Sequence, residues 1–125
     1  MRPKFMICRR CGNLVGVLKD SGASIVCCGE KMEVLEPNTV EASGEKHIPM
    51  VSLEEGKVTV NVGSVDHPML PEHFIQWIYL QTENGGQRKV LKPGDAPNVT
   101  FWYGDDKPVA VYEYCNLHGL WMTKI

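Results

Sequence analysis

Four cysteines near the N-terminus constrain the fold of this chain more than any other feature. Cys8 and Cys11 form a C-x-x-C pair, and Cys27 and Cys28 follow as adjacent residues. The segment that ends at residue 36 is shorter than the roughly 40 residues below which a chain usually needs a disulfide, a metal or a partner to fold. Four thiolates arranged tetrahedrally select zinc or iron among the common metals. The sequence therefore predicts a small metal knuckle over residues 1–36, and the cysteines alone leave the identity of its metal open.

The adjacent cysteine pair predicts an unusual local geometry. Neighbouring side chains of an extended strand point to opposite faces. Cys27 and Cys28 can therefore bind one metal only if the backbone twists between them, and we expect a strained tetrahedron.

The rest of the chain, residues 37–125, has the pattern of β structure. Strands are predicted at 57–63, 74–81, 98–103 and 108–115, where residues alternate in polarity or are rich in β-branched and aromatic types. The second strand is expected to end in a turn at Asn84-Gly85-Gly86, and 92–97 is a loop by composition. No segment after residue 38 has helical periodicity of useful length. Short strands at this spacing favour an all-β fold with a β-sandwich.

All four histidines lie in this second part, together with the fifth cysteine. They are His47, His67, His73 and His118, and Cys115 precedes the last of them by three residues. Structural zinc sites normally use four ligands. Four imidazoles and one thiolate would instead form a five-coordinate centre with an open sixth position, where a small molecule could bind.

Two other metal assignments remain open on the residues alone. Cys115, His118 and Met122, with one upstream histidine, come close to the two-histidine, one-cysteine, axial-methionine pattern of blue-copper electron carriers. That reading leaves two histidines without a role. A structural or binding module with zinc at both sites is the other alternative.

Composition excludes several classes of function. The chain has 125 residues and a formal net charge of -2, which argues against a general nucleic-acid-binding surface. No run of about 18 apolar residues is present, so no membrane span is expected. The N-terminus lacks the pattern of a secretory signal, and we expect a cytosolic protein with reduced thiols. An odd cysteine count fits metal ligation better than disulfides.

Taken together, these motifs resemble the desulfoferrodoxin family of superoxide reductases, specifically its two-iron class. The resemblance covers nearly the whole chain and rests on C-x-x-CGN (8–13), VCCGE (26–30), EKHIP (45–49), VGSVDHPM (62–69), EHFIQWI (72–78), LKPGDAP (91–97) and EYCNLHGLW (113–121). It implies a small desulforedoxin-like (rubredoxin-type) four-cysteine domain over 1–36. It also implies an immunoglobulin-like β-sandwich over 37–125 that carries a catalytic iron.

The resemblance also implies roles for individual residues and for partners. The first iron would be held by Cys8, Cys11, Cys27 and Cys28. The catalytic iron would be held equatorially by His47, His67, His73 and His118, and axially by Cys115. The implied activity is reduction of superoxide to hydrogen peroxide, in a cytosolic homodimer that receives electrons from a rubredoxin-like donor. The first iron could relay electrons or hold the N-terminal domain together.

Residues beside these ligands add three further expectations. Lys46 is the best candidate for local attraction of anionic superoxide. Glu45, two residues before His47, would face the same way in an extended chain and could reach the open position. The backbone N–H groups of Asn116 and Leu117 are expected to donate hydrogen bonds to the Cys115 sulfur.

Overall fold

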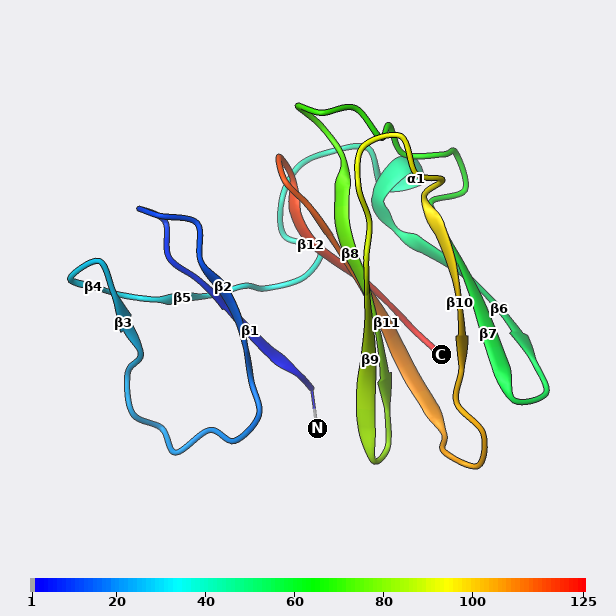
Figure 1. The fold of residues 1–125 in the computed structure, drawn as a ribbon, viewed down its shortest axis with the longest axis horizontal. Helices are drawn as coiled ribbons and strands as arrows, with labels where there is room; N and C mark the ends of the chain where they lie inside the picture. Colours follow the sequence, from blue (N-terminus) through cyan, green and yellow to red (C-terminus); the bar gives the residue numbers. More distant parts are fainter. Residues whose placement is uncertain (1) are drawn as a thin grey trace. The chain divides into compact units, whose positions relative to one another are not determined.

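The computed structural model describes residues 2–125, and nearly all of their regular structure is β (Figure 1). The all-β prediction is confirmed, and the one helix among the described residues is the four-residue α1 (Gly44–His47). The chain divides into two compact units, Met1–Glu36 and Pro37–Ile125.

The first unit consists of two small sheets. Strand β1 (Lys4–Ile7) pairs with both β2 (Leu14–Val17) and β5 (Glu33–Val34), and β3 (Val26–Cys27) forms a hairpin with β4 (Glu30–Lys31). Its buried apolar residues are few: Phe5, Met6, Ile7, Met32 and Leu35. A core this small agrees with the expectation that the unit requires a metal to fold.

The second unit contains seven strands in two antiparallel sheets. The three-stranded sheet has the order β10 (Asn98–Trp102), β7 (Lys57–Val62), β6 (Pro49–Glu54). The four-stranded sheet has the order β12 (Gly119–Lys124), β11 (Pro108–Cys115), β8 (Ile75–Thr82), β9 (Gly85–Val90). A pair of sheets with three and four strands is the immunoglobulin-like sandwich that was expected.

The core lies between these two sheets. Strand β7 alternates buried valines with half-buried polar residues, so Val58, Val60 and Val62 all face inward. They pack with Phe101 of the same sheet and with Ile78 of the four-stranded sheet. The period-two pattern read from 57–63 therefore identified one inner face of the sandwich.

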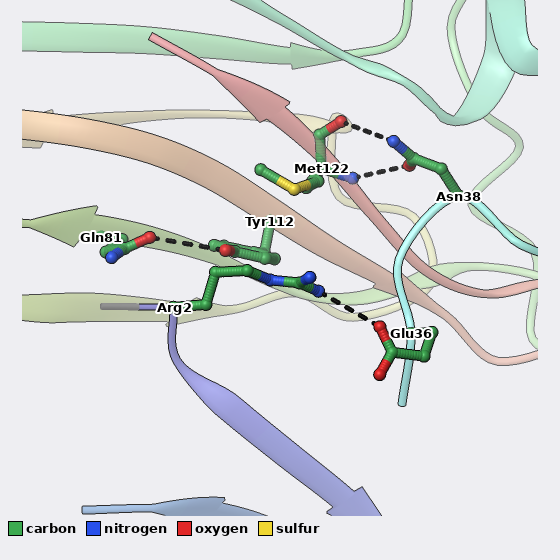
Figure 2. A network of polar contacts seen from close by, with 6 residues as sticks. All are labelled: Arg2, Glu36, Asn38, Gln81, Tyr112 and Met122. Atoms are coloured by element: carbon green, nitrogen blue, oxygen red, sulfur yellow. Dashed lines mark hydrogen bonds and ion pairs between the residues drawn. The ribbon is translucent and has the colours of Figure 1, made fainter. Parts of the chain in front are cut away.

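Side chains bridge the edges of the sheets. The side chain of Asn38 pairs with the outer edge of β12 as another strand would. Its Nδ2 donates to Met122 O at 3.2 Å, and Met122 N donates to Asn38 Oδ1 at 2.9 Å (Figure 2). Between the two sheets, Thr123 Oγ1 donates to Pro49 O at 2.6 Å and Gln87 Nε2 donates to Trp102 O at 2.8 Å. These bonds satisfy backbone groups that the sheets leave open.

Three strands of the second unit were absent from the sequence prediction: β6, β9 and β12. Strand β9 begins at Gly85, so the turn after β8 is formed by Glu83 and Asn84 rather than by Asn84-Gly85-Gly86. Gly85 and Gly86 pair with Thr82 and Gln81 in the ladder. Gly86 also lies under the Tyr79 ring, where any side chain would collide with the Tyr79 hydroxyl. Close approach of the Tyr79 ring to the backbone, rather than a turn, is thus the reason that glycine fits this position.

Candidate metal centres

The four N-terminal cysteines converge on one point. Their sulfur atoms all lie within 4.8 Å of one another, although β2 and the 18–25 loop separate the two pairs in sequence. Backbone N–H groups of the C-x-x-C turn point at the sulfurs: Cys11 N lies 3.5 Å from Cys8 Sγ, and Asn13 N lies 3.4 Å from Cys11 Sγ. Such N–H groups stabilise thiolates, and donation by Cys11 lowers the pKa of Cys8 to about 7.

The adjacent cysteines show the twist that two neighbouring ligands need. Cys28 has a φ of 53°, in the left-handed region, and Gly29 follows at 77°. An L residue other than glycine rarely adopts this conformation. It brings the Cys28 sulfur to 4.0 Å from that of Cys27. Hydrogen bonds from the Cys28 thiol to the neighbouring sulfurs, first of all that of Cys11, raise the pKa of Cys28 to about 12, so a cation is needed to make all four sulfurs thiolates together.

The second group of predicted ligands gathers at one end of the sandwich. The register explains this: Pro49 at the start of β6 pairs with Val62 at the end of β7, and Cys115 at the end of β11 pairs with Ile75 at the start of β8. Segments that leave these strand ends carry the histidines. His47 closes α1, His67 and His73 lie in the loop between β7 and β8, and His118 lies in the turn between β11 and β12.

The four imidazoles form a ring. Neighbouring ring centroids around this cycle are 4.6 Å apart for His47 and His67, 4.7 Å for His67 and His73, 5.1 Å for His73 and His118, and 4.9 Å for His118 and His47. Across the cycle, His47 and His73 are 6.4 Å apart. A square of this side has a diagonal close to that value. The imidazoles therefore occupy the corners of an approximate square.

The nitrogens at the centre of this ring carry lone pairs that face one another. His47 Nδ1 is 2.7 Å from Ser43 O and His67 Nδ1 is 2.6 Å from Pro68 O. A carbonyl only accepts, so both Nδ1 atoms carry the proton and both Nε2 atoms are bare. These two Nε2 atoms lie 3.1 Å apart, and His118 Nδ1 also lies 3.1 Å from His47 Nε2. Bare nitrogens this close repel one another unless a cation lies between them.

A metal fits this arrangement. Two nitrogens each about 2.05 Å from one metal are about 2.9 Å apart at 90° and about 3.3 Å apart at the tetrahedral angle. The observed 3.1 Å lies between these values. His73 Nε2 is buried and has no hydrogen-bond partner among the described residues, as expected for a further ligand atom.

Burial favours the neutral, metal-binding form of three of these imidazoles, those of His47, His67 and His73. His47 and His67 are each 2% exposed. Burial lowers the pKa of His67 to about 4 against the opposing pull of the Pro68 carbonyl, and burial also lowers the pKa of His47 and His73. Neutral imidazole is the form that ligates metals.

Cys115 lies on the buried side of the imidazole ring. Its Sγ is 3.9 Å from His118 Nδ1, and its ligand atom falls within 4.8 Å of those of His47, His67 and His73. Burial raises the pKa of its thiol, while the N–H groups of Leu117 and His118 lower it. The expectation for Leu117 therefore holds, but that for Asn116 was wrong, because Asn116 N donates to Phe74 O at 3.2 Å.

Two family models match the chain in series. "Desulfoferrodoxin, N-terminal domain" matches residues 4–35, and "Desulfoferrodoxin" matches residues 39–124. The chain belongs to the desulfoferrodoxin family. The desulfoferrodoxin of Syntrophotalea carbinolica is 46% identical over 117 residues, which are 94% of this chain and 92% of that protein. The superoxide reductase of Pyrococcus horikoshii is 38% identical in an alignment 100 positions long, which covers 66% of this chain and 87% of that protein.

Solved structures agree with this membership. The crystal structure of the superoxide reductase from Treponema pallidum is 42% identical, has a TM-score of 0.82 and covers 99% of this chain and 100% of its own. The one-iron superoxide reductase from Giardia intestinalis is 30% identical, has a TM-score of 0.56 and covers 65% of this chain and 97% of its own. The predicted family, fold class and pair of metal sites are thus confirmed in this desulfoferrodoxin.

The blue-copper alternative has no support in the structure. Tyr112 and Met122 are paired in the β11–β12 ladder, and so are Cys115 and Gly119. Paired residues share one face of a sheet, and residues separated by an odd number point to opposite faces. Met122 therefore projects from the face of the sheet opposite to Cys115, and it cannot provide an axial ligand.

The premise about Glu45 was also wrong. Residues 44–47 form α1 rather than an extended segment, so Glu45 and His47 point in different directions. Glu45 is exposed, whereas His47 is buried.

Lys46 is exposed as well, and its charge is among the causes, after burial, that lower the pKa of His47 and His73. The positive charge of Lys46 therefore acts at the imidazole ring.

Sequence reasoning missed the side chain that holds His73 in place. Asn116 Nδ2 donates to Glu72 O at 3.0 Å, and Phe74 N donates to Asn116 Oδ1 at 2.9 Å. The Asn116 amide thus holds the backbone on both sides of His73. Asn116 directly follows Cys115, so it links two ligand-bearing segments. It also missed Trp121, whose ring stacks on His47 at 4.9 Å. The motifs contain both residues, but neither type signals such a role.

Proposed function

We propose that this chain is a superoxide reductase. The proposal rests on one observation above all: four imidazoles in an approximate square and one buried cysteine sulfur converge at one end of the sandwich. The relatives named superoxide reductase support it. In the proposed reaction, superoxide takes up one electron and two protons and becomes hydrogen peroxide. Iron held by His47, His67, His73, His118 and Cys115 would supply that electron.

The arrangement of the ligands determines where superoxide can approach. Cys115 is fully buried, whereas His73 and His118 are only half-buried. A small anion would therefore reach a metal held by these residues from the side away from Cys115. The buried thiolate would donate electron density from behind, and two N–H groups moderate its charge.

Lys46 is the proposed group that attracts superoxide. The protein as a whole carries a net charge of -2, so attraction of an anion must be local. Neither Lys46 nor Glu45 forms a salt bridge with another described residue, so the ammonium is available. Glu45 is kept as a candidate for the open position only because the family resemblance implies it.

The four-cysteine unit is proposed to hold a second iron through Cys8, Cys11, Cys27 and Cys28. We propose residues 1–36 as a separate metal-binding domain and 37–125 as the catalytic domain. A rubredoxin-like donor, a homodimer and a cytosolic location complete the proposal. Among residues 2–125, no helix is long and apolar enough to cross a membrane. A Cys11→Ser variant that keeps full turnover with its donor would exclude an obligatory electron relay.

The activity is tested with reduced, iron-loaded protein and a pulse of superoxide. A reductase forms one hydrogen peroxide per superoxide and no oxygen, whereas a dismutase forms one peroxide and one oxygen from two. Lys46→Ala is expected to slow the oxidation of the protein, more at low than at high ionic strength. Lys124→Ala is the matched control, since Lys124 lies five residues along β12 from Gly119 at the site end, about 17 Å away. Zinc alone at the histidine site of native protein would refute the proposal.

A further inference from the structure

The segment that carries Glu45 and Lys46 has little support of its own. Helix α1 is a single turn of four residues, and its N-cap residue Ser43 makes no side-chain capping bond. Two backbone bonds reach across its ends: Lys46 N donates to Ser43 O at 3.2 Å, and Ile48 N donates to Gly44 O at 2.8 Å. An isolated turn of this length is not stable in water, so other contacts must hold it.

The turn Gly63–Ser64–Val65, which follows β7, supplies those contacts. We name it the 63–65 turn. Val65 N donates to Glu45 O at 2.9 Å, and Ser64 Oγ donates to the same oxygen at 3.2 Å. Glu45 O belongs to the peptide that joins Glu45 to Lys46. Two donors on one carbonyl fix the plane of that peptide, and with it the directions in which both side chains leave the backbone.

Gly63 allows the two segments to approach this closely. A Cβ at this position would lie 2.6 Å from Glu45 O and 2.9 Å from Ile48 O. Both are backbone atoms, so they cannot rotate away as a flexible side chain would. Gly63 is thus required by steric contact with the segment that carries Lys46.

The 63–65 turn is itself anchored to the rigid sheet. Asn61, on β7, donates from Nδ2 to Gly63 O at 2.7 Å and to Asp66 Oδ1 at 2.9 Å. Gly63 N donates to Val65 O at 3.2 Å. The 63–65 turn therefore fixes the Glu45–Lys46 peptide relative to the sandwich.

We propose that Ser64 is a positioning residue, which holds the Glu45–Lys46 peptide so that the Lys46 ammonium remains at the outward face of the imidazole ring. This inference rests on the proposed reaction with superoxide. Ser64 touches neither the ligands nor the substrate in this proposal, and it acts only through the carbonyl that it shares with Val65.

The first test needs no reaction. In the zinc-loaded protein, hydrogen exchange of the Val65 amide reports opening of its bond to Glu45 O. Ser64→Ala is expected to accelerate this exchange about fivefold, because the loss of one hydrogen bond of ordinary net strength shifts the opening equilibrium by about that factor. Gly63→Ala is expected to accelerate it further. The His67 amide, which bonds to Val62 O at 2.8 Å, should not change. We call the two bonds to Glu45 O, from Val65 N and from Ser64 Oγ, the clamp. An unchanged Val65 exchange rate would show that Ser64 does not support the clamp, and it would overturn the inference.

The second test is a double-mutant cycle on the rate at which superoxide oxidises the reduced protein. If Ser64 acts through Lys46, then Ser64→Ala slows the reaction at low salt in the wild type but has no further effect in Lys46→Ala. Ser64→Thr, which keeps the hydroxyl, should restore the rate and its salt dependence. Ser52→Ala, on exposed β6, is the control. Equal slowing in both backgrounds would show a merely structural defect and overturn the inference.

The two proposals fail in different ways. If the wild-type protein does not react with superoxide, the proposed function fails and the positioning role fails with it, while amide exchange still decides whether the clamp exists. If the wild type reacts and Lys46→Ala slows it, but Ser64→Ala does not, the function stands and the positioning role is wrong.

Discussion

Replacement of Asn116 by alanine is expected to weaken metal binding at the histidine site without a comparable loss elsewhere. The change removes two side-chain hydrogen bonds, one to Glu72 O at 3.0 Å and one from Phe74 N at 2.9 Å. Each is worth about 1 kcal/mol net, so together they contribute about 2 kcal/mol. Because they flank His73, their loss falls mainly on the metal-bound state, in which that imidazole must be in place.

A loss of about 2 kcal/mol corresponds to an affinity roughly 30-fold lower, since 1.4 kcal/mol is a factor of ten. Outer partners of metal ligands typically change affinity by about 10- to 100-fold, which includes this value. Cobalt(II) titration against a competing chelator measures it, with quenching of Trp121 as the signal because its ring stacks on His47. Asn116→Asp keeps the acceptor for Phe74 N but loses the donor to Glu72 O, so it should give an intermediate affinity.

Asn38 provides the matched control. Its amide makes the same kind of two-way bridge, to Met122 N and Met122 O, at a place away from the ligands (Figure 2). Asn38→Gly suits the φ of 61° and removes only that bridge. It is expected to lower stability and to leave cobalt affinity unchanged. The reasoning is refuted if Asn116→Ala binds cobalt within twofold of the wild type, or if both variants lose affinity equally.

Three further outcomes are expected. Glu113 is fully buried and neither carboxyl oxygen has a partner among the described residues, and burial raises its pKa well above 4.5. The stability that it confers below pH 4.5 is then lost as pH rises, by up to about 1.4 kcal/mol per unit until its folded pKa is reached. Between pH 5.5 and 7.5, the free energy of unfolding in urea of metal-free Glu113→Gln should therefore rise relative to that of the metal-free wild type. A constant difference between the two proteins over this range would contradict this. Cys8→Ser should unfold the first unit and leave the tryptophan-monitored midpoint of the second unchanged, because all three tryptophans follow residue 37. One common transition would be evidence against it. Ile78→Val, in the sandwich core, should cost about 1 kcal/mol in the same assay without changing cobalt affinity.

The ligands could be named from the sequence because their chemistry is carried by rare residue types. All four histidines and all five cysteines of the chain fall into the two clusters. Residue types alone could not choose among iron, copper and zinc at the histidine site. The face alternation of β11 and β12, which excludes Met122, depends on a strand pairing that no short motif specifies.

What the sequence did not reveal depends on tertiary contacts. The glycines that begin β9 have the composition of a turn, yet Gly86 lies in the ladder because the Tyr79 ring covers it. Helix α1 is too short to produce any periodicity, so the orientation of Glu45 could not be inferred. Glu113 alternates with Tyr112 and Tyr114 as an outward polar residue would, although it faces the core with Cys115.

The ligands and the outer charges of the site are held by different means, and this difference has a consequence. Cys115 lies on a strand paired on both sides, and His73 is held by the Asn116 amide. Lys46 lies on a single helical turn whose position depends mainly on one carbonyl and the 63–65 turn. A change in the clamp can therefore move the charge that we propose attracts superoxide, while the imidazole square stays intact. The rate of the reaction with superoxide can therefore vary among variants while the absorption spectrum of the bound metal stays the same.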